Sequence, residues 1–136
     1  KTIPSFEYLD LKGEVFTEKN IKANTSTMFV YFNSECEYCN EEAKMIKENI
    51  KALKNVQIIF VSFQTQNEIT TFATKHQLLN YGNISFLRDS KVSFATTFDV
   101  SSLPCLVLYD KNKNLIEKIK GQIKVANLVK KLQIAD

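Results

Sequence analysis

The stretch Met28-Phe29-Val30-Tyr31-Phe32-Asn33-Ser34-Glu35-Cys36-Glu37-Tyr38-Cys39 joins an apolar run to two cysteines that lie three residues apart. The apolar run, within residues 27–33, predicts a central strand that is covered on both faces. Ser34 and Glu37 form an S-x-x-E pattern, which predicts a capped helix start. The two cysteines therefore fall where a buried strand gives way to a helix, with both sulfurs on one helical face.

The position of Cys36 and Cys39 predicts redox chemistry. A thiol at a helix N-terminus meets unpaired N–H groups and the positive end of the helix dipole, and both stabilise its thiolate. The thiolate is the attacking species in disulfide exchange, and a C-x-x-C inside a β-α-β pattern is typical of a thioredoxin-like dithiol. A purely structural cysteine pair is one alternative. A zinc site is another, for which only Cys105 and His76 remain as further ligands.

Strands and helices alternate along the chain, and most have a clear pattern or cap. The predicted strands are residues 5–9, 14–16, 27–33, 56–62, 84–87, 106–109 and 115–119. The predicted helices contain the stripe Ala43, Ile46, Ile50 and Leu53, residues 65–79, residues 90–98, and the stripe Val125, Leu128, Val129 and Leu132. This order predicts an α/β fold with a central mixed β-sheet flanked by helices and an N-terminal β-hairpin extension.

Length and composition indicate one globular unit. The chain has 136 residues, three glycines and two prolines, so we expect a single domain over residues 1–136. The net charge of +3 is spread without a dense basic cluster, which argues against nucleic-acid binding. No apolar stretch is long enough to span a membrane, and the opening residues 1–4 do not form a signal peptide.

Several segments together share the pattern of one protein family. They are Phe6-Glu7-Tyr8-Leu9-Asp10-Leu11-Lys12-Gly13, Phe29-Val30-Tyr31-Phe32, Cys36-Glu37-Tyr38-Cys39, Phe98-Asp99-Val100-Ser101-Ser102-Leu103-Pro104 and Gly121. With them the chain resembles the thioredoxin-like thiol–disulfide oxidoreductases, and more specifically their extracytoplasmic TlpA/ResA-type branch, over residues 4–132. The resemblance implies a thioredoxin-like fold.

The resemblance also implies roles for individual residues. Cys36 would be the catalytic nucleophile and Cys39 the catalytic resolving thiol. Pro104 would be a cis-proline opposite them, and an X-Pro bond is the usual place for a cis peptide. Leu103 and Pro104 would bind the substrate chain through backbone contacts, and Tyr38 is a further expected substrate contact.

Two glutamates are predicted to tune the pKa values of the dithiol. Glu42 lies one helical turn after Cys39, where the TlpA/ResA-type branch has a glutamate with this role, although an exposed surface glutamate is the alternative. Glu37 and Glu35 flank Cys36, and their negative charge disfavours a nearby thiolate. We therefore expect a reducing protein rather than a strongly oxidising one.

Three other residues need an interpretation. Cys105 is a candidate third thiol that could trap or shuttle a disulfide near Cys36, with a small buried hydrophobe as the alternative. His76, the only histidine, is expected to be a packed or surface residue. Asn33 stands three residues before Cys36, where the peroxidase relatives of this fold need a threonine, so peroxidase activity is not favoured.

The sequence thus predicts an enzyme that reduces protein disulfides through a mixed disulfide, with no cofactor and no metal. Its expected partners are protein disulfides or dithiols and an electron-donor reductase, which could be membrane-bound, and we expect a monomer. The resemblance implies an extracytoplasmic location, periplasmic or membrane-tethered, with no signal or anchor within these residues. A redox-inactive thioredoxin-like binding module and a metal-binding protein using Cys36, Cys39 and Cys105 are the alternative functions.

Overall fold

A seven-stranded mixed sheet organises the chain in the computed structural model, which describes residues 1–132. The strands are β1 (Glu7–Leu9), β2 (Val15–Thr17), β3 (Ser26–Tyr31), β4 (Val56–Ser62), β5 (Ile84–Arg88), β6 (Cys105–Tyr109) and β7 (Leu115–Lys120). The helices are α1 (Glu37–Glu48), α2 (Gln66–Lys75), α3 (Phe94–Phe98) and α4 (Val125–Leu132), with short 3-10 turns at Glu18–Asn20 and Ile50–Leu53. Residues 133–136, which the single-domain prediction includes, lie outside the described residues.

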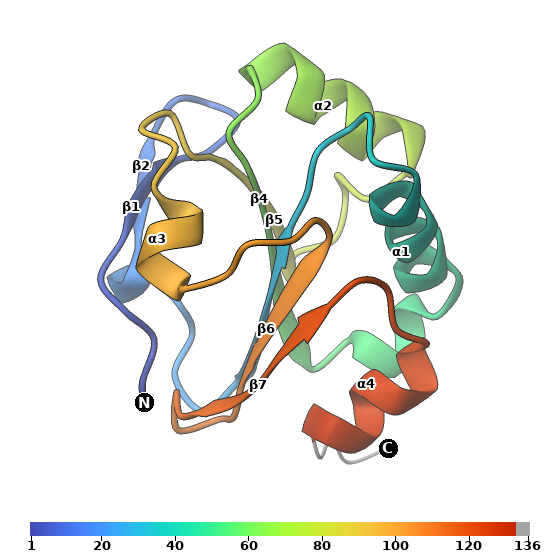
Figure 1. Cartoon of the computed structure of the whole chain (residues 1–136). Coiled ribbons are helices and arrows are strands. Elements are labelled where there is room, and N and C mark those ends of the chain that lie inside the picture. The colour runs from blue at the N-terminus through green and yellow to red at the C-terminus, as the bar shows by residue number, and fades with distance from the viewer. Residues whose placement is uncertain (133–136) are drawn as a thin grey trace.

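The strand order across the sheet is β2-β1-β5-β4-β3-β6-β7. Strands β3, β4 and β5 are parallel, β6 and β7 add antiparallel pairs beside β3, and the β1–β2 hairpin pairs with β5. Helices α1, α2 and α4 cover one face of the sheet, and α3 lies on the other face (Figure 1). This arrangement agrees with the predicted mixed sheet, its flanking helices and its N-terminal hairpin.

The two central strands explain why the sheet is covered on both faces. Every residue of β4 is buried, and in β3 only Ser26 is not fully buried. Alternate side chains of a strand point to opposite faces, so Met28 and Val30 join the core under α1, α2 and α4, whereas Phe29 and Tyr31 join the core under α3. Continuous apolar runs are therefore needed, as in other parallel sheets with two covered faces.

The start of α1 differs from the prediction. The N-cap residue is Cys36, whose Sγ accepts a hydrogen bond from the Cys39 N–H at 3.2 Å. Ser34 does not cap the helix with Glu37, because its hydroxyl accepts from Gln64 Nε2 at 2.9 Å instead. The helix also ends at Glu48, so Ile50 and Leu53 belong to a 3-10 turn that continues the apolar stripe.

Helices α2 and α3 are shorter than predicted, although their positions are correct. The capping box of Thr65 and Glu68 opens α2 as expected, but the helix ends at Lys75 because Gln77 takes a left-handed φ of 57°. Helix α3 begins at Phe94 rather than residue 90. Its first N–H groups are bound by the buried Asp89 carboxylate, which accepts from Ser93 N and Phe94 N at 2.7 Å each.

The N-terminal residues are attached to the turn between β6 and β7. Thr2 forms an isolated antiparallel bridge with Asn114, and Leu115 N donates to the carbonyl of Lys1 at 2.6 Å. This turn lies at the end of β6 that is remote from Cys105. In Figure 1 the N-terminus accordingly lies at the lower left, whereas α1 begins at the upper right.

Candidate active site

The pair Cys36 and Cys39 lies at the N-terminus of α1, directly beyond the end of β3. Both cysteines are free thiols; Cys36 is half-buried and Cys39 is 1% exposed. The Cys39 N–H points at Cys36 Sγ, so the sulfur occupies the position of an N-cap acceptor and its negative charge would be stabilised there. The accessible sulfur is therefore the one that the helix start favours as a nucleophile.

Cys39 differs from Cys36 because it is enclosed by the core under α1, α2 and α4. Burial raises the pKa of the Cys39 thiol to about 12, and a side-chain hydrogen bond with Cys36 raises it further, with smaller contributions from the charges of Cys36 and Glu42. A backbone N–H of Asn33 acts in the opposite direction on that pKa. Cys39 thus remains protonated near neutral pH until a neighbouring group removes its proton or the surroundings change.

Glu42 is fully buried beside this pair, on the inner side of α1. Its Oε1 accepts a hydrogen bond from the backbone N–H of Ile123 at 2.7 Å, whereas its Oε2 is buried without a partner. Burial raises the pKa of Glu42 from 4.5 to about 7, and the bond from Ile123 counteracts part of that rise. The carboxyl group can therefore gain or lose a proton near neutral pH.

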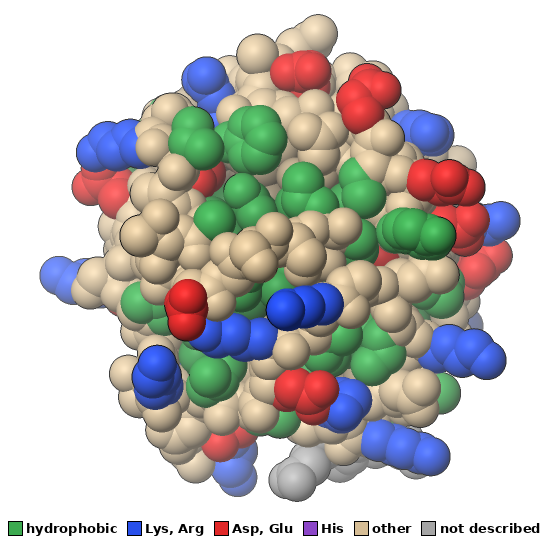
Figure 2. Space-filling model, viewed as in Figure 1, with side chains coloured by type: hydrophobic (Ala, Val, Ile, Leu, Met, Phe, Trp, Pro, Cys, Tyr) green, Lys and Arg blue, Asp and Glu red, His purple; other side chains and the backbone are tan. Residues whose placement is uncertain are grey.

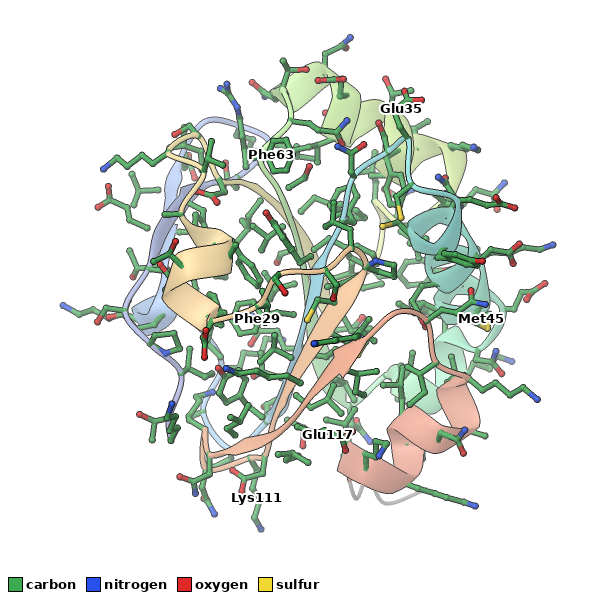
Figure 3. All side chains as sticks on the ribbon, viewed as in Figure 1. Phe29, Glu35, Met45, Phe63, Lys111 and Glu117 are labelled. Carbon is green, nitrogen blue, oxygen red and sulfur yellow. The ribbon has the colours of Figure 1, made fainter. Side chains whose placement is uncertain are left out.

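The other two acidic residues around the dithiol are on the outside. Glu35 and Glu37 are exposed, and Glu35 lies in the loop that leads into α1 (Figure 3). Tyr38, between the two cysteines, is 59% exposed, so its ring is available to another molecule. Figure 2 shows acidic and basic side chains interspersed on one face of the protein, without a large area of one sign.

Leu103 and Pro104 are placed at the same edge of the sheet as the dithiol. Strands β3 and β6 are antiparallel, with Tyr31 opposite Cys105, so the residue before Cys105 lies where the chain leaves β3 toward Cys36. The Leu103–Pro104 peptide bond is cis. Leu103 is partly buried and packs against the same core as Cys36 and Cys39.

Cys105 is not brought to the dithiol. Its side chain belongs to the core under α3, whereas Cys36 and Cys39 pack on the core at the opposite face of the sheet. Cys105 is 1% exposed, and burial raises the pKa of its thiol, an effect that the charges of Lys118 and Lys120 partly offset. The structure therefore agrees with a small buried hydrophobe and places the candidate third thiol away from Cys36.

We expect Cys105→Ala to reduce disulfides at a rate within about twofold of the wild-type rate, because the side chain lies behind the sheet. The free energy of unfolding should fall by about 1 kcal/mol for the lost packing of a small buried side chain. Steady-state reduction of insulin and urea denaturation measure the two effects. A tenfold loss of rate, or a disulfide between residues 36 and 105 in the oxidised wild-type protein, would contradict this placement.

Sequence reasoning did not identify three polar residues that hold the loop before Cys36. Gln64 Oε1 accepts from Ser34 N at 2.7 Å, and Gln64 Nε2 donates to the Ser34 hydroxyl. Asn40 Nδ2 donates to the carbonyl of Cys36 at 2.9 Å, and His76 bonds Asn40 in turn. The available signals were a polar residue two positions after an apolar strand and an amide directly after the second cysteine.

The described part of the chain lacks two other kinds of feature. No three His, Cys, Asp or Glu side chains within residues 1–132 are grouped in a way that could hold a metal ion. None of the helices in the same residues is long and apolar enough to cross a membrane.

Comparisons with known proteins agree with this geometry. No curated protein matches the sequence. Similar solved structures include a secreted Mycobacterium tuberculosis disulfide oxidoreductase homologous to E. coli DsbE, with a TM-score of 0.78, 17% identity and coverage of 94% of each chain. StoA from Bacillus subtilis has a TM-score of 0.73 at 17% identity and covers 96% of this chain and 98% of its own.

A third similar structure is the pneumococcal exposed lipoprotein thioredoxin Etrx1 from Streptococcus pneumoniae, with a TM-score of 0.72 and 19% identity over 95% of this chain and 98% of that one. These likenesses confirm the predicted thioredoxin-like fold. The family model described as "AhpC/TSA family" matches residues 1–118, which include the dithiol and Pro104. The chain therefore belongs to the AhpC/TSA family and has a thioredoxin-like fold.

Proposed function

We propose that this protein is a thiol–disulfide oxidoreductase that reduces disulfides in proteins, and that residues 1–136 act as one thioredoxin-like domain. The observation that carries the proposal is the division of labour within one dithiol. Cys36 is half-buried at the N-cap of α1, where the Cys39 N–H stabilises its thiolate, and Cys39 is enclosed behind it. This pairing of an accessible sulfur with a protected one is what disulfide exchange requires.

The reaction has two displacement steps. The Cys36 thiolate attacks one sulfur of the substrate disulfide, forming a Cys36–substrate mixed disulfide and releasing the other substrate sulfur as a thiolate, which takes up a proton. Cys39 then loses its proton and attacks Cys36 Sγ. The second substrate sulfur leaves as a thiol, and the Cys36–Cys39 disulfide holds the oxidising equivalents.

Glu42 is suited to receive the proton of Cys39. Its pKa of about 7 leaves a substantial fraction ionised near neutral pH, and its charge is close enough to raise the pKa of Cys39. The unpartnered Oε2 provides a free acceptor in a buried site. Glu42 therefore tunes the resolving thiol, whereas Glu37 is exposed on the outer side of the helix start.

The substrate chain would be held beside the dithiol. Leu103 and Pro104 offer their backbone at the edge of the sheet where Cys36 lies, and the exposed ring of Tyr38 adds an apolar contact. Contacts through backbone and one aromatic ring are not specific for a particular sequence, which suits a reductase that accepts several proteins.

The direction of electron flow follows from the thiol environment. Strong oxidants in this class owe their potential to a stabilised reduced form. Here burial disfavours the Cys39 thiolate, and Glu35 and Glu37 place negative charge beside Cys36. The reduced dithiol is therefore stabilised little relative to the disulfide. The protein should therefore be a reductase, recharged by an electron donor that could be membrane-bound.

We place the protein outside the cytoplasm and expect it to act as a monomer. The location is supported by two similar structures, one described as secreted and the other as an exposed lipoprotein. Extracytoplasmic disulfides are also the natural substrates for a dithiol of this kind.

The test is the reduction potential of the Cys36–Cys39 couple, measured by thiol–disulfide equilibration in a Cys105→Ser background, together with insulin reduction. A potential below about −230 mV with insulin turnover that disappears in Cys36→Ser is expected of a reductase. A potential near about −120 mV would make the protein a disulfide donor. Folded protein that cannot reduce insulin would refute the enzymatic function.

A further inference from the structure

Asn40 links the dithiol loop to α2. Its Nδ2 donates to the carbonyls of Ser34 and Cys36 at 3.0 and 2.9 Å. Its Oδ1 lies 2.7 Å from Nε2 of His76 and 3.4 Å from Nζ of Lys75. Because carbonyl oxygens only accept, the amide must face the loop with its nitrogen, and its oxygen must face His76. The Nε2 of His76 therefore carries a hydrogen and donates it to Asn40.

The position of the His76 ring is well fixed by its surroundings. It is the C-cap residue of α2, and its backbone N–H bonds back to the Phe72 carbonyl at 3.1 Å. Its ring packs edge-on against Phe72, with 4.6 Å between the ring centroids. A half-buried ring held by a helix end and an aromatic neighbour has few alternative positions. The bond from His76 thus restricts the Asn40 amide to one orientation.

The loop has little other support on this side. A cleft of about 260 Å³ lies between the loop and α2, and Ser34, Glu35, Asn40 and Lys75 are among the residues that line it. Because this cleft is open space, α2 does not pack against Ser34 and Glu35 there, and hydrogen bonds must hold that part of the loop. Gln64 also bonds Ser34, and the Cys36 N–H donates to the Asn33 carbonyl at 3.0 Å. The Cys36 carbonyl accepts from Asn40 twice, from its side-chain amide and from its helical N–H.

We propose that Asn40 and His76 form a positioning pair for the dithiol. His76 orients the amide of Asn40, and Asn40 fixes the carbonyl of Cys36 so that Cys36 Sγ remains aligned with the Cys39 N–H. Neither side chain contributes a reacting sulfur, so both would act through Cys36. This inference rests on the proposed function for its biological meaning, since the pair keeps the attacking sulfur activated for disulfide exchange.

The test compares His76→Leu, Asn40→Leu and the double variant. The readout is the rate at which iodoacetamide alkylates Cys36 at pH 7, followed by mass spectrometry of the peptide that contains it. Each single variant should react about three to ten times more slowly, as expected when a thiolate loses an aligned donor. The double variant should react no more slowly than Asn40→Leu, because His76 acts through Asn40.

Two controls separate positioning from general destabilisation. His76→Gln, which keeps a side-chain N–H donor, should recover most of the wild-type rate. Lys75→Met removes the longer, exposed contact to the same oxygen and should leave the rate unchanged. Urea denaturation of every variant reports stability separately from the alkylation rate.

The proposal is overturned if His76→Leu alkylates at the wild-type rate, or if the two single effects multiply in the double variant. It is also overturned if His76→Gln is as slow as His76→Leu. Alkylation needs no substrate disulfide and no turnover. A wild-type protein that fails to reduce insulin would therefore refute the proposed function, while the alkylation rates would still decide the positioning role.

Discussion

Replacing Cys39 by serine is expected to convert the protein from a catalyst into a covalent trap. Cys36 keeps its place at the N-cap of α1, where it accepts a hydrogen bond from the backbone N–H of residue 39, so it can still attack a disulfide. A serine hydroxyl does not displace a thiol from a mixed disulfide. Steady-state insulin reduction should fall by at least about 100-fold, since removing one member of a cooperating pair removes most of the turnover.

The adduct itself gives the sharper measurement. Cys39→Ser incubated with a small disulfide should accumulate one covalent adduct per chain in a non-reducing intact-mass measurement, and dithiothreitol should remove it. The matched variant Cys36→Ser should form none, because Cys39 is 1% exposed. An adduct that forms equally in both variants would reverse the assigned roles of the two cysteines.

The second large effect concerns stability and pH. The pKa of Glu42 is about 7 in the folded protein and 4.5 as an ordinary glutamate. Below pH 4.5 Glu42 is mostly protonated in both the folded and the unfolded chain, so it causes little change in the free energy of unfolding there. As the pH rises from 4.5 to 7, the unfolded chain releases a proton that the folded protein retains, and stability falls. The accumulated loss is about 3 kcal/mol at pH 8.

Glu42→Gln should remove this dependence. Its side-chain oxygen can still accept from Ile123 N, and the amide does not titrate in this range. Urea denaturation at pH 4.5 and pH 8 should show a decline in unfolding free energy that is about 3 kcal/mol smaller than in the wild type. Glu41→Gln, an exposed neighbour on the same helix, is the control and should keep the wild-type decline. An unchanged decline in Glu42→Gln would mean that folding does not raise the pKa of Glu42.

Local patterns predicted the elements of this fold because the physical causes are local. The apolar runs that became β3 and β4 and the Thr65–Glu68 capping box each act within a few residues. The predicted start of a helix was wrong where a residue distant in sequence formed the hydrogen bonds instead. Ser34 was expected to cap α1, but Gln64, 30 residues away, bonds both its N–H and its hydroxyl. No rule based on nearby residues could have shown that competition.

In the candidate site, too, features set by nearby residues were predictable and those set by distant partners were not. Cys36 and Cys39 were identifiable because their spacing and helix-start position carry the chemistry. Cys105 was harder to interpret, since its distance from the dithiol depends on which face of β6 it occupies, and a single residue beside a proline does not reveal that face. The sequence predicts only a packed or surface position for His76, because its partner Asn40 is 36 positions away along the chain.

The attachment of the first residues to the β6–β7 turn has a practical consequence for orientation. Lys1 and Thr2 are bonded near Asn114, at the end of the sheet opposite the edge from which Cys36 emerges. Figure 3 shows the same separation, with Lys111 of that turn at the bottom and Glu35 at the top. A bead, electrode or carrier protein joined to Lys1 would therefore be attached at the end of the sheet remote from Cys36. The thiols would face outward into the surrounding liquid, free to meet large folded targets.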